Sequence, residues 1–206
     1  MNFKILKIPV YIDPSFWVFF LFIIGSGQGG YRTNLLFGVV VVFSILLHEL
    51  GHALVALFYN AKPVVRLYAF GGETTFDKSV ITNKQNFLII LGGPLIQFLF
   101  ILTMYALLQF NLMHNYYLVY VVLITKYLNT MWLYFNLLPI IPLDGGWLLR
   151  YVLEKKFGRK GYAASIIIGL LTILIAIPFV YLRGYYIFLT MLVIFGLQYC
   201  KLWQER

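Results

Sequence analysis

The sequence predicts a membrane α-helical protein with six transmembrane helices and a small β-sheet at the membrane surface, formed by about residues 3–12 and 63–76. Two observations support this fold class. Hydrophobic residues make up 62% of the 206-residue chain and charged residues only 11%, far less charge than a soluble domain of this size carries. The apolar residues are also grouped into segments, most of which are long enough to cross a bilayer, while the first, at about residues 15–27, is short for a span unless residues 10–12 contribute.

Six apolar segments account for the predicted transmembrane helices. Polar residues, glycine or proline separate them, as expected where membrane helices end. The third segment is interrupted by Gly92-Gly93-Pro94, and a proline-bounded stretch after the fourth leads to a short helix at about residues 147–157. The six segments cover about residues 15–27, 34–59, 87–110, 116–138, 162–182 and 185–202.

The predicted sheet comes from two regions that differ from the apolar segments. Residues 3–12 are extended in character and end at the breakers Asp13-Pro14. Residues 61–84 are more polar and contain a run of β-branched and aromatic residues, which favours strands. We expect a hairpin here that turns at Gly71-Gly72, with the N-terminal strand pairing beside it.

Basic residues are distributed unequally between the two ends of the predicted spans. With the N-terminus in the cytoplasm, the outer side receives only Arg32 and Arg183, and Lys126 falls within a span. The other thirteen basic residues lie on the cytoplasmic side, which predicts a multi-pass protein of a bacterial-type cell membrane with both termini cytoplasmic. The net charge of +9 is therefore explained by membrane orientation, and we expect no binding of nucleic acid.

The second segment contains the motif His48-Glu49-Leu50-Gly51-His52. On a helix, His48 and His52 lie one turn apart on the same face and can share a zinc ion, while Glu49 can accept a proton from zinc-bound water. Each of these polar side chains is disfavoured within a bilayer, so their presence in an apolar span indicates a functional site. The charge distribution places this motif toward the cytoplasmic side.

A catalytic zinc site usually has three protein ligands and one open position. Among the remaining acidic and histidine residues, Asp144 is the candidate by elimination, because it lies in a Pro-Leu-Asp-Gly turn where a span meets the cytoplasmic side. His114, the only other histidine, falls in an outer loop. Asp144 is equally suited to be the N-cap of the helix that begins at Gly145, so both interpretations stay open at this point.

Together these motifs resemble the site-2 protease family of intramembrane zinc metalloproteases, and within it most closely the stage IV sporulation protein FB branch. The resemblance covers nearly the whole chain. It is carried by the histidine motif in the second span, by Gly92-Gly93-Pro94 in the third and by Phe70-Gly71-Gly72. It is carried further by Asn136-Leu137-Leu138-Pro139, which runs into Pro142-Leu143-Asp144-Gly145-Gly146.

The resemblance implies one Zn²⁺ per chain, held by His48, His52 and Asp144, with Glu49 as the general base. It also implies that Asn136 lies near the substrate or the developing oxyanion. Gly92 and Gly93 are implied to lie in a loop near the substrate path, and Phe70 belongs to a further family-like turn. The expected substrate is a membrane-embedded or membrane-tethered protein, such as a pro-transcription factor or an anti-sigma factor, and a membrane regulatory partner would be compatible with it.

The alternative function is that of a membrane metal-binding or transport protein without protease activity. A transporter more often carries several ionisable residues across successive spans, or repeated halves, and the sequence shows neither. We expect residues 1–206 to form a single integral-membrane metalloprotease domain without the CBS or PDZ domain found in many relatives. The oligomeric state is not predicted.

Overall fold

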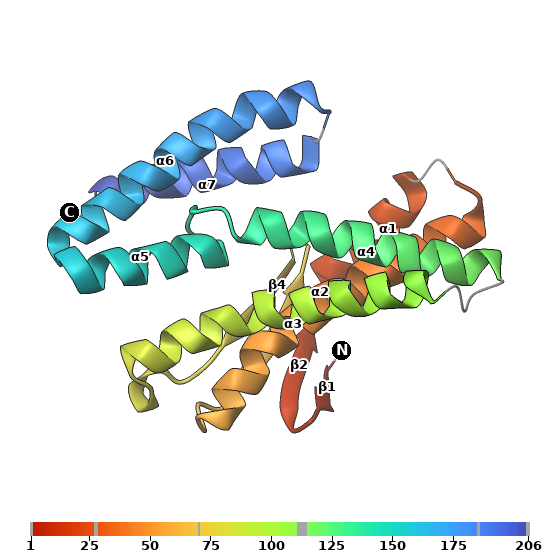
Figure 1. The fold of residues 1–206 in the computed structure, drawn as a ribbon, viewed down its shortest axis with the longest axis horizontal. Coiled ribbons are helices and arrows are strands. Elements are labelled where there is room, and N and C mark those ends of the chain that lie inside the picture. Colours follow the sequence, from red (N-terminus) through yellow and green to blue (C-terminus); the bar gives the residue numbers. More distant parts are fainter. Residues whose placement is uncertain (1, 27–28, 70, 111–114, 185, 205–206) are drawn as a thin grey trace. The chain divides into compact units, whose positions relative to one another are not determined.

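A computed structural model describes residues 2–26, 29–69, 71–110, 115–184 and 186–204 (Figure 1). The described chain is mostly helical, with one small sheet, and forms two compact units, residues 1–133 and 134–206. The strands are β1 (Asn2–Ile5), β2 (Ile8–Ile12), β3 (Val64–Tyr68) and β4 (Gly71–Thr75). The helices are α1 (Pro14–Ser26), α2 (Tyr31–Phe58), η1 (Lys78–Val80), α3 (Asn83–Gln109), α4 (Tyr116–Asn136), α5 (Asp144–Phe157), α6 (Arg159–Leu182) and α7 (Tyr186–Gln204).

The predicted sheet is confirmed, with four strands in the order β1-β2-β3-β4. The N-terminal region is a hairpin rather than a single strand, because Leu6 and Lys7 adopt positive φ angles that reverse the chain. β2 then pairs with β3 in parallel, and β3 pairs with β4 antiparallel. β4 is thus an edge strand of the described sheet.

The predicted turn at Gly71-Gly72 is wrong, because both glycines lie within β4. Gly71 has a φ of 135°, which favours glycine. A Cβ on Gly72 would lie 2.3 Å from Cγ of Glu49 in α2. Gly72 therefore allows the strand to approach the helix closely. The local sequence does not distinguish a glycine with this role from a glycine in a turn.

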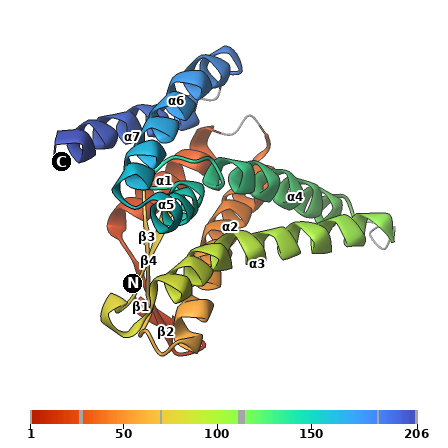
Figure 2. The same ribbon diagram turned by 60° about the vertical axis from the view of Figure 1, so that its left-hand side comes forward.

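One face of the sheet packs on α1 and α2 (Figure 2). Alternate strand residues point to this face, as expected for a two-sided sheet. The core that results contains Ile8, Val10, Phe16, Ile45, Ala53, Val65 and Leu67. The sheet is thereby attached to the helix that carries the histidine motif.

Helices α2 and α3 approach each other closely at two glycines. A Cβ on Gly51 would lie 2.4 Å from the backbone oxygen of Gly92, and a Cβ on Gly92 would lie 2.4 Å from that of Gly51. Small residues allow such approaches between helices in membranes. α3 is a continuous helix through Gly92, Gly93 and Pro94, so the predicted interruption is wrong, and the two glycines lie in a helix rather than in the implied loop. Their place near the substrate path stays a prediction.

We expect Gly51→Ala to lower the free energy of unfolding by about 1–3 kcal/mol, since the new methyl group meets backbone rather than a mobile side chain. Thermal unfolding in detergent would measure the change. The matched control is Gly25→Ala in α1, where a Cβ meets nothing within 4 Å. Equal melting temperatures for wild-type protein and Gly51→Ala would contradict the close packing.

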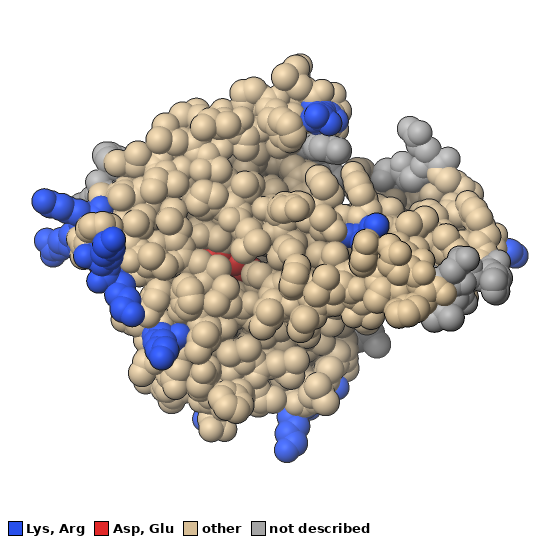
Figure 3. Space-filling model, in the orientation of Figure 1, with Lys and Arg blue, Asp and Glu red and all other residues tan. Residues whose placement is uncertain are grey.

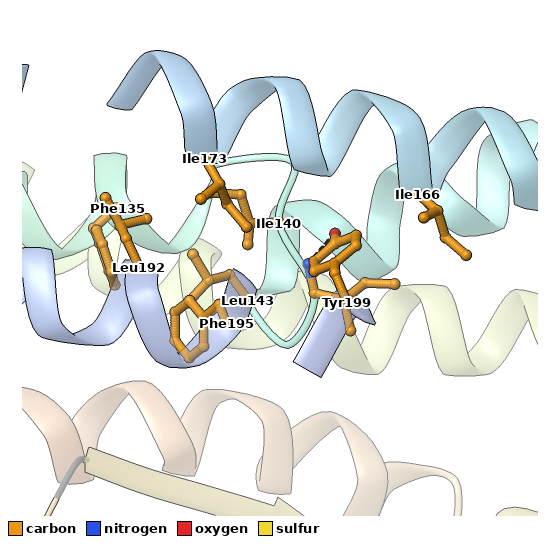
Figure 4. Packing of buried hydrophobic residues seen from close by; sticks show 9 residues of the cluster. Phe135, Ile140, Leu143, Ile166, Ile173, Leu192, Phe195 and Tyr199 are labelled. Atoms are coloured by element: carbon orange, nitrogen blue, oxygen red, sulfur yellow. Dashed lines mark hydrogen bonds between the residues drawn. The ribbon is translucent and has the colours of Figure 1, made fainter. Parts of the chain in front are cut away.

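The second unit has its own hydrophobic core, built from the end of α4, residues 137–143, α6 and α7 (Figure 4). Tyr199 is fully buried there, and its hydroxyl accepts a hydrogen bond from the backbone N–H of Ile141 at 2.7 Å. A Cβ on Gly169 would overlap this hydroxyl. The core therefore holds the loop that leads into α5.

Four of the predicted spans are long and apolar enough to cross a membrane within the described residues: α2, α3, α4 and α6. The apolar parts of α1 and α7 are shorter. Large hydrophobic side chains are widely exposed, including Ile175 at 75% and Leu182 at 81%. Most of the visible surface lacks charge, and Lys and Arg gather where α5 meets α6, around Lys155 and Lys156 (Figure 3). This surface is that of an integral membrane protein.

Candidate metal centre

The two motif histidines lie side by side on α2. His48 and His52 are 4% and 8% exposed, and their ring centroids are 4.8 Å apart. The two Nε2 atoms are 3.1 Å apart. This arrangement follows from the helix repeat, which brings residues four positions apart onto the same face.

The hydrogen bonds of the rings determine which nitrogen carries the proton. Nδ1 of His52 lies 2.8 Å from the carbonyl oxygen of Ile89, which can only accept, so Nδ1 donates. A 3.3 Å approach of the Gly93 N–H to the same nitrogen is then not a hydrogen bond. Nδ1 of His48 lies 3.2 Å from the side-chain oxygen of Gln97 and also donates.

Because Nδ1 of each ring donates to a neighbouring oxygen, Nε2 is the nitrogen that each ring turns toward the other, at 3.1 Å. A shared cation would make this approach of two lone pairs favourable. Two nitrogen ligands of a tetrahedral zinc ion are separated by roughly 3.3 Å. The donor chemistry and the spacing of His48 and His52 therefore both fit two ligands of one metal ion.

Gly93 lies directly against the ring edges of the two histidines, next to Nε2 of His52. A Cβ at this position would lie 2.3 Å from Nε2 of His52 and 2.9 Å from Cε1 of His48. The position is in α3, whose Ile89 carbonyl also holds His52. The sequence pattern indicates that Gly93 matters, but its contact with the imidazoles cannot be read from that pattern.

Glu49 is 7% exposed and contacts β4. The Thr74 hydroxyl lies 2.7 Å from Oε2 of Glu49 and 3.0 Å from its backbone oxygen. The Thr74 hydroxyl has one proton to donate, and the shorter distance indicates that it donates to the carboxylate. Thr74 is not among the site residues that the sequence predicts, because a threonine in a predicted strand carries no signal of its own.

Tyr68, on β3, is near enough to Glu49 for the charge of that carboxylate to act on its hydroxyl group. Burial raises the pKa of its hydroxyl, and the negative charges of Glu73 and Glu49 raise it further. The phenol therefore stays protonated near neutral pH and can act only as a neutral hydrogen-bonding group there. It adds no negative charge beside Glu49.

The second unit holds two further predicted residues. Asp144 is the first residue of α5, and the N-cap is Leu143, so the interpretation of Asp144 as the N-cap is wrong. Asn136 is the last residue of α4 and is 8% exposed. A Cβ on Gly145 or Gly146 would overlap backbone of residues 137–141, so both glycines let the loop fold tightly onto the start of α5.

Several of the expected roles stay predictions. Ligation of the metal by Asp144 and a substrate-side role for Asn136 belong to this group. Phe70 lies outside the described residues, as does His114. Four polar residues that belong to no sequence motif lie buried in the apolar helices of the first unit, namely Ser44, Gln97, Thr125 and Asn129. Their one sequence signal is a polar side chain within an otherwise apolar span.

Comparison with known proteins places these features in a family context. The family model described as "Peptidase family M50" matches residues 111–177. Zinc metalloprotease MJ0392 of Methanocaldococcus jannaschii is 35% identical over 164 residues, covering 76% of this chain and 46% of that protein. Stage IV sporulation protein FB of Bacillus subtilis is 28% identical over 153 residues, covering 73% of this chain and 50% of that protein.

A solved structure shares the fold. The site-2 protease from Methanocaldococcus jannaschii matches with a TM-score of 0.66 and 28% identity, covering 98% of this chain and 94% of that one. The chain spans about half the length of the curated relatives it matches. The similarity thus extends over both compact units and includes the histidine helix.

Proposed function

The chain belongs to the site-2 protease family, and from this we propose that it is an intramembrane zinc metalloprotease that hydrolyses a peptide bond in or near a substrate's transmembrane segment. The observation that carries the proposal is the buried pair of Nε2 atoms 3.1 Å apart with Glu49 next to it in an apolar helix. A purely structural role would not favour two facing lone pairs in such surroundings.

The cofactor is one zinc ion per chain, held by His48, His52 and Asp144. The ligand set of two imidazoles and one carboxylate is common in catalytic zinc sites and leaves a position for water. When bound, zinc lowers the pKa of a water molecule toward neutrality and polarises a carbonyl group. Asp144 is supported by the family motif and by its place at the first residue of α5, after a tightly held loop.

Glu49 is the general base. Its carboxylate accepts the proton of the attacking water and later returns it to the leaving amine. The Thr74 hydroxyl donates to Oε2 and orients the carboxylate for this transfer. Asn136 assists by donating to the substrate carbonyl oxygen as negative charge develops there.

The substrate must be extended at the scissile bond, because helical amides are shielded by their own hydrogen bonds. β4 supports this requirement, since it is an edge strand and its residues Gly72 and Thr74 contact Glu49. An extended segment pairing with the outer edge of β4 would gain main-chain hydrogen bonds beside the base. Phe70, which precedes this strand, is proposed to contact the substrate as well.

The proposed topology has six spans, both termini in the cytoplasm and the active site toward the cytoplasmic side. The charge distribution supports it, as do the basic residues at the junction of α5 and α6. Residues 1–206 then form one metalloprotease domain. The substrates are membrane-tethered proteins such as a pro-transcription factor or an anti-sigma factor.

The function is tested with purified protein in lipid vesicles and a membrane-tethered reporter with an extended juxtamembrane segment. We expect one zinc per chain by elemental analysis, and cleavage that stops with a chelator and returns with zinc. Zinc flux across the vesicle without cleavage would instead support the metal-transport alternative. Full cleavage by metal-free protein would contradict the proposal.

Thr74→Val tests how the base is held. We expect kcat to fall by about tenfold with unchanged zinc content, because the variant keeps the side-chain shape but loses the hydrogen bond to the carboxylate. Initial rates of reporter cleavage measure this. Thr103→Val is the control, since its exposed hydroxyl donates to the backbone oxygen of Leu99 within the same helix, α3. Equal rates in wild type and Thr74→Val would contradict the orienting role.

A further inference from the structure

A chain of buried polar side chains connects three apolar helices behind the histidine pair. It begins at Ser44 on α2, passes through Asn129 on α4 and Gln97 on α3, and returns to α2 at His48. The exposed fractions are 6%, 1%, 0% and 4%, respectively. Burying two side-chain amides in apolar helices costs free energy unless every polar atom is hydrogen-bonded, so such a chain needs an explanation.

The direction of each hydrogen bond follows from one carbonyl group. The backbone oxygen of Thr125 lies 2.8 Å from the side chain of Asn129 and can only accept, so the amide NH₂ of Asn129 faces it. The same NH₂ donates to the Ser44 hydroxyl at 2.8 Å. The side-chain oxygen of Asn129 is therefore turned toward Gln97.

This orientation is passed on to the histidine. The Asn129 oxygen accepts from the NH₂ of Gln97 at 3.2 Å, which leaves the Gln97 oxygen facing His48. That oxygen lies 3.2 Å from Nδ1 of His48 and requires the proton to be on Nδ1. Nε2 of His48 then carries the lone pair that a metal ion needs.

We propose that Gln97, oriented by Asn129, is a positioning residue that fixes the tautomer and ring orientation of His48 for metal binding. The inference rests on the proposed function and adds a residue pair to it. Hydrogen bonds to the second nitrogen of a histidine ligand orient the ring and raise its basicity. Polar residues also hold membrane helices together, but helix association does not require the Gln97 oxygen to face a histidine.

The test compares zinc affinity in Gln97→Met and Gln97→Glu, measured on detergent-solubilised protein by competition with a chromogenic chelator. Methionine has a similar volume but is only a weak acceptor for the hydrogen bond from Nδ1 of His48. We therefore expect the zinc affinity of Gln97→Met to fall roughly 10- to 100-fold. Glutamate keeps an oxygen acceptor for Nδ1, so we expect its affinity to stay within a few-fold of wild type. Both variants lose the donor to Asn129 and should lose similar thermal stability.

A matched control is Ser165→Ala in the second unit, which removes a buried hydroxyl that donates to the Tyr162 carbonyl at 2.7 Å. We expect its zinc affinity to be unchanged. Should Gln97→Met not fold, Asn129→Leu tests the same chain one step further from the metal, with a smaller expected loss of about fivefold. The absorption spectrum of the cobalt-substituted protein should shift in Gln97→Met and resemble wild type in Gln97→Glu.

The outcomes separate this inference from the proposed function. Unchanged zinc affinity in Gln97→Met, with zinc bound to the wild type, overturns the positioning role alone. Equal losses in Gln97→Met and Gln97→Glu also overturn it, because they indicate helix packing rather than an acceptor for His48. Wild-type protein that binds no zinc would overturn the proposed function and this inference together.

Discussion

Glu49→Gln is expected to reduce peptide-bond cleavage by a factor of about 10²–10⁴ while zinc stays bound. The glutamine side chain has the same size as glutamate. Its amide oxygen can still accept a hydrogen bond from the Thr74 hydroxyl, which lies 2.7 Å from Oε2 of Glu49. It cannot take a proton from water or deliver one to the leaving amine. His48 and His52 are untouched, so the loss belongs to proton transfer rather than to metal binding.

The measurement combines zinc content with kcat/KM on the membrane-tethered reporter. Glu154→Gln makes the same chemical change on α5, where the carboxylate pairs with Arg150 at 3.1 Å, and is expected to cleave normally. A Glu49→Gln protein that binds zinc and cleaves at the wild-type rate would contradict the general-base role. Loss of zinc in Glu49→Gln would instead make Glu49 part of the metal site.

Gly93→Ala is expected to abolish zinc binding and cleavage without preventing folding. The added Cβ would lie 2.3 Å from Nε2 of His52, so the ring has to turn away and give up its 2.8 Å hydrogen bond to the Ile89 carbonyl. The atom displaced is the tip of a side chain rather than helix backbone. A change of one methyl group therefore removes a metal ligand at modest cost to packing.

Gly93→Ala is best compared with alanine substitutions at two other helical glycines, the adjacent Gly92 in α3 and Gly25 in α1. Gly92→Ala would meet the backbone oxygen of Gly51 and is expected to lower the melting temperature more strongly than Gly93→Ala. Gly25→Ala, which meets nothing within 4 Å, should change neither property. Retention of wild-type zinc affinity by Gly93→Ala, measured by chelator competition, would show that the ring does not need this space.

Local sequence patterns are sufficient to predict most of the elements. Apolar segment length and breakers locate the helices to within a few residues, as for α4, predicted at about residues 116–138 and found at Tyr116–Asn136. The patterns fail where a residue type has two uses. Gly71-Gly72 and Gly92-Gly93-Pro94 suit turns and breaks, but here they permit a strand and a helix to lie against α2.

Spacing along one helix accounts for the part of the metal centre that the sequence predicts. His48, Glu49 and His52 are brought together by the helical repeat alone, so a single segment specifies two ligands and a base. Other hydrogen bonds at the centre join residues that are far apart in the sequence. Thr74 is 25 positions from its partner Glu49, and Gln97 is 49 positions from its partner His48. Asn129 is 85 positions from its partner Ser44. Nothing in the local sequence of either partner indicates such a contact.

The chemistry of the centre is therefore determined by the sequence itself, and the orientation of its ligands is not. A motif identifies donors because side-chain type and helix periodicity are local properties. Which ring nitrogen carries the proton depends instead on the Ile89 carbonyl and on the amide of Gln97, both supplied by α3. Such hydrogen bonds exist only once α2, α3 and α4 have packed against one another, which is why tertiary structure alone decides them.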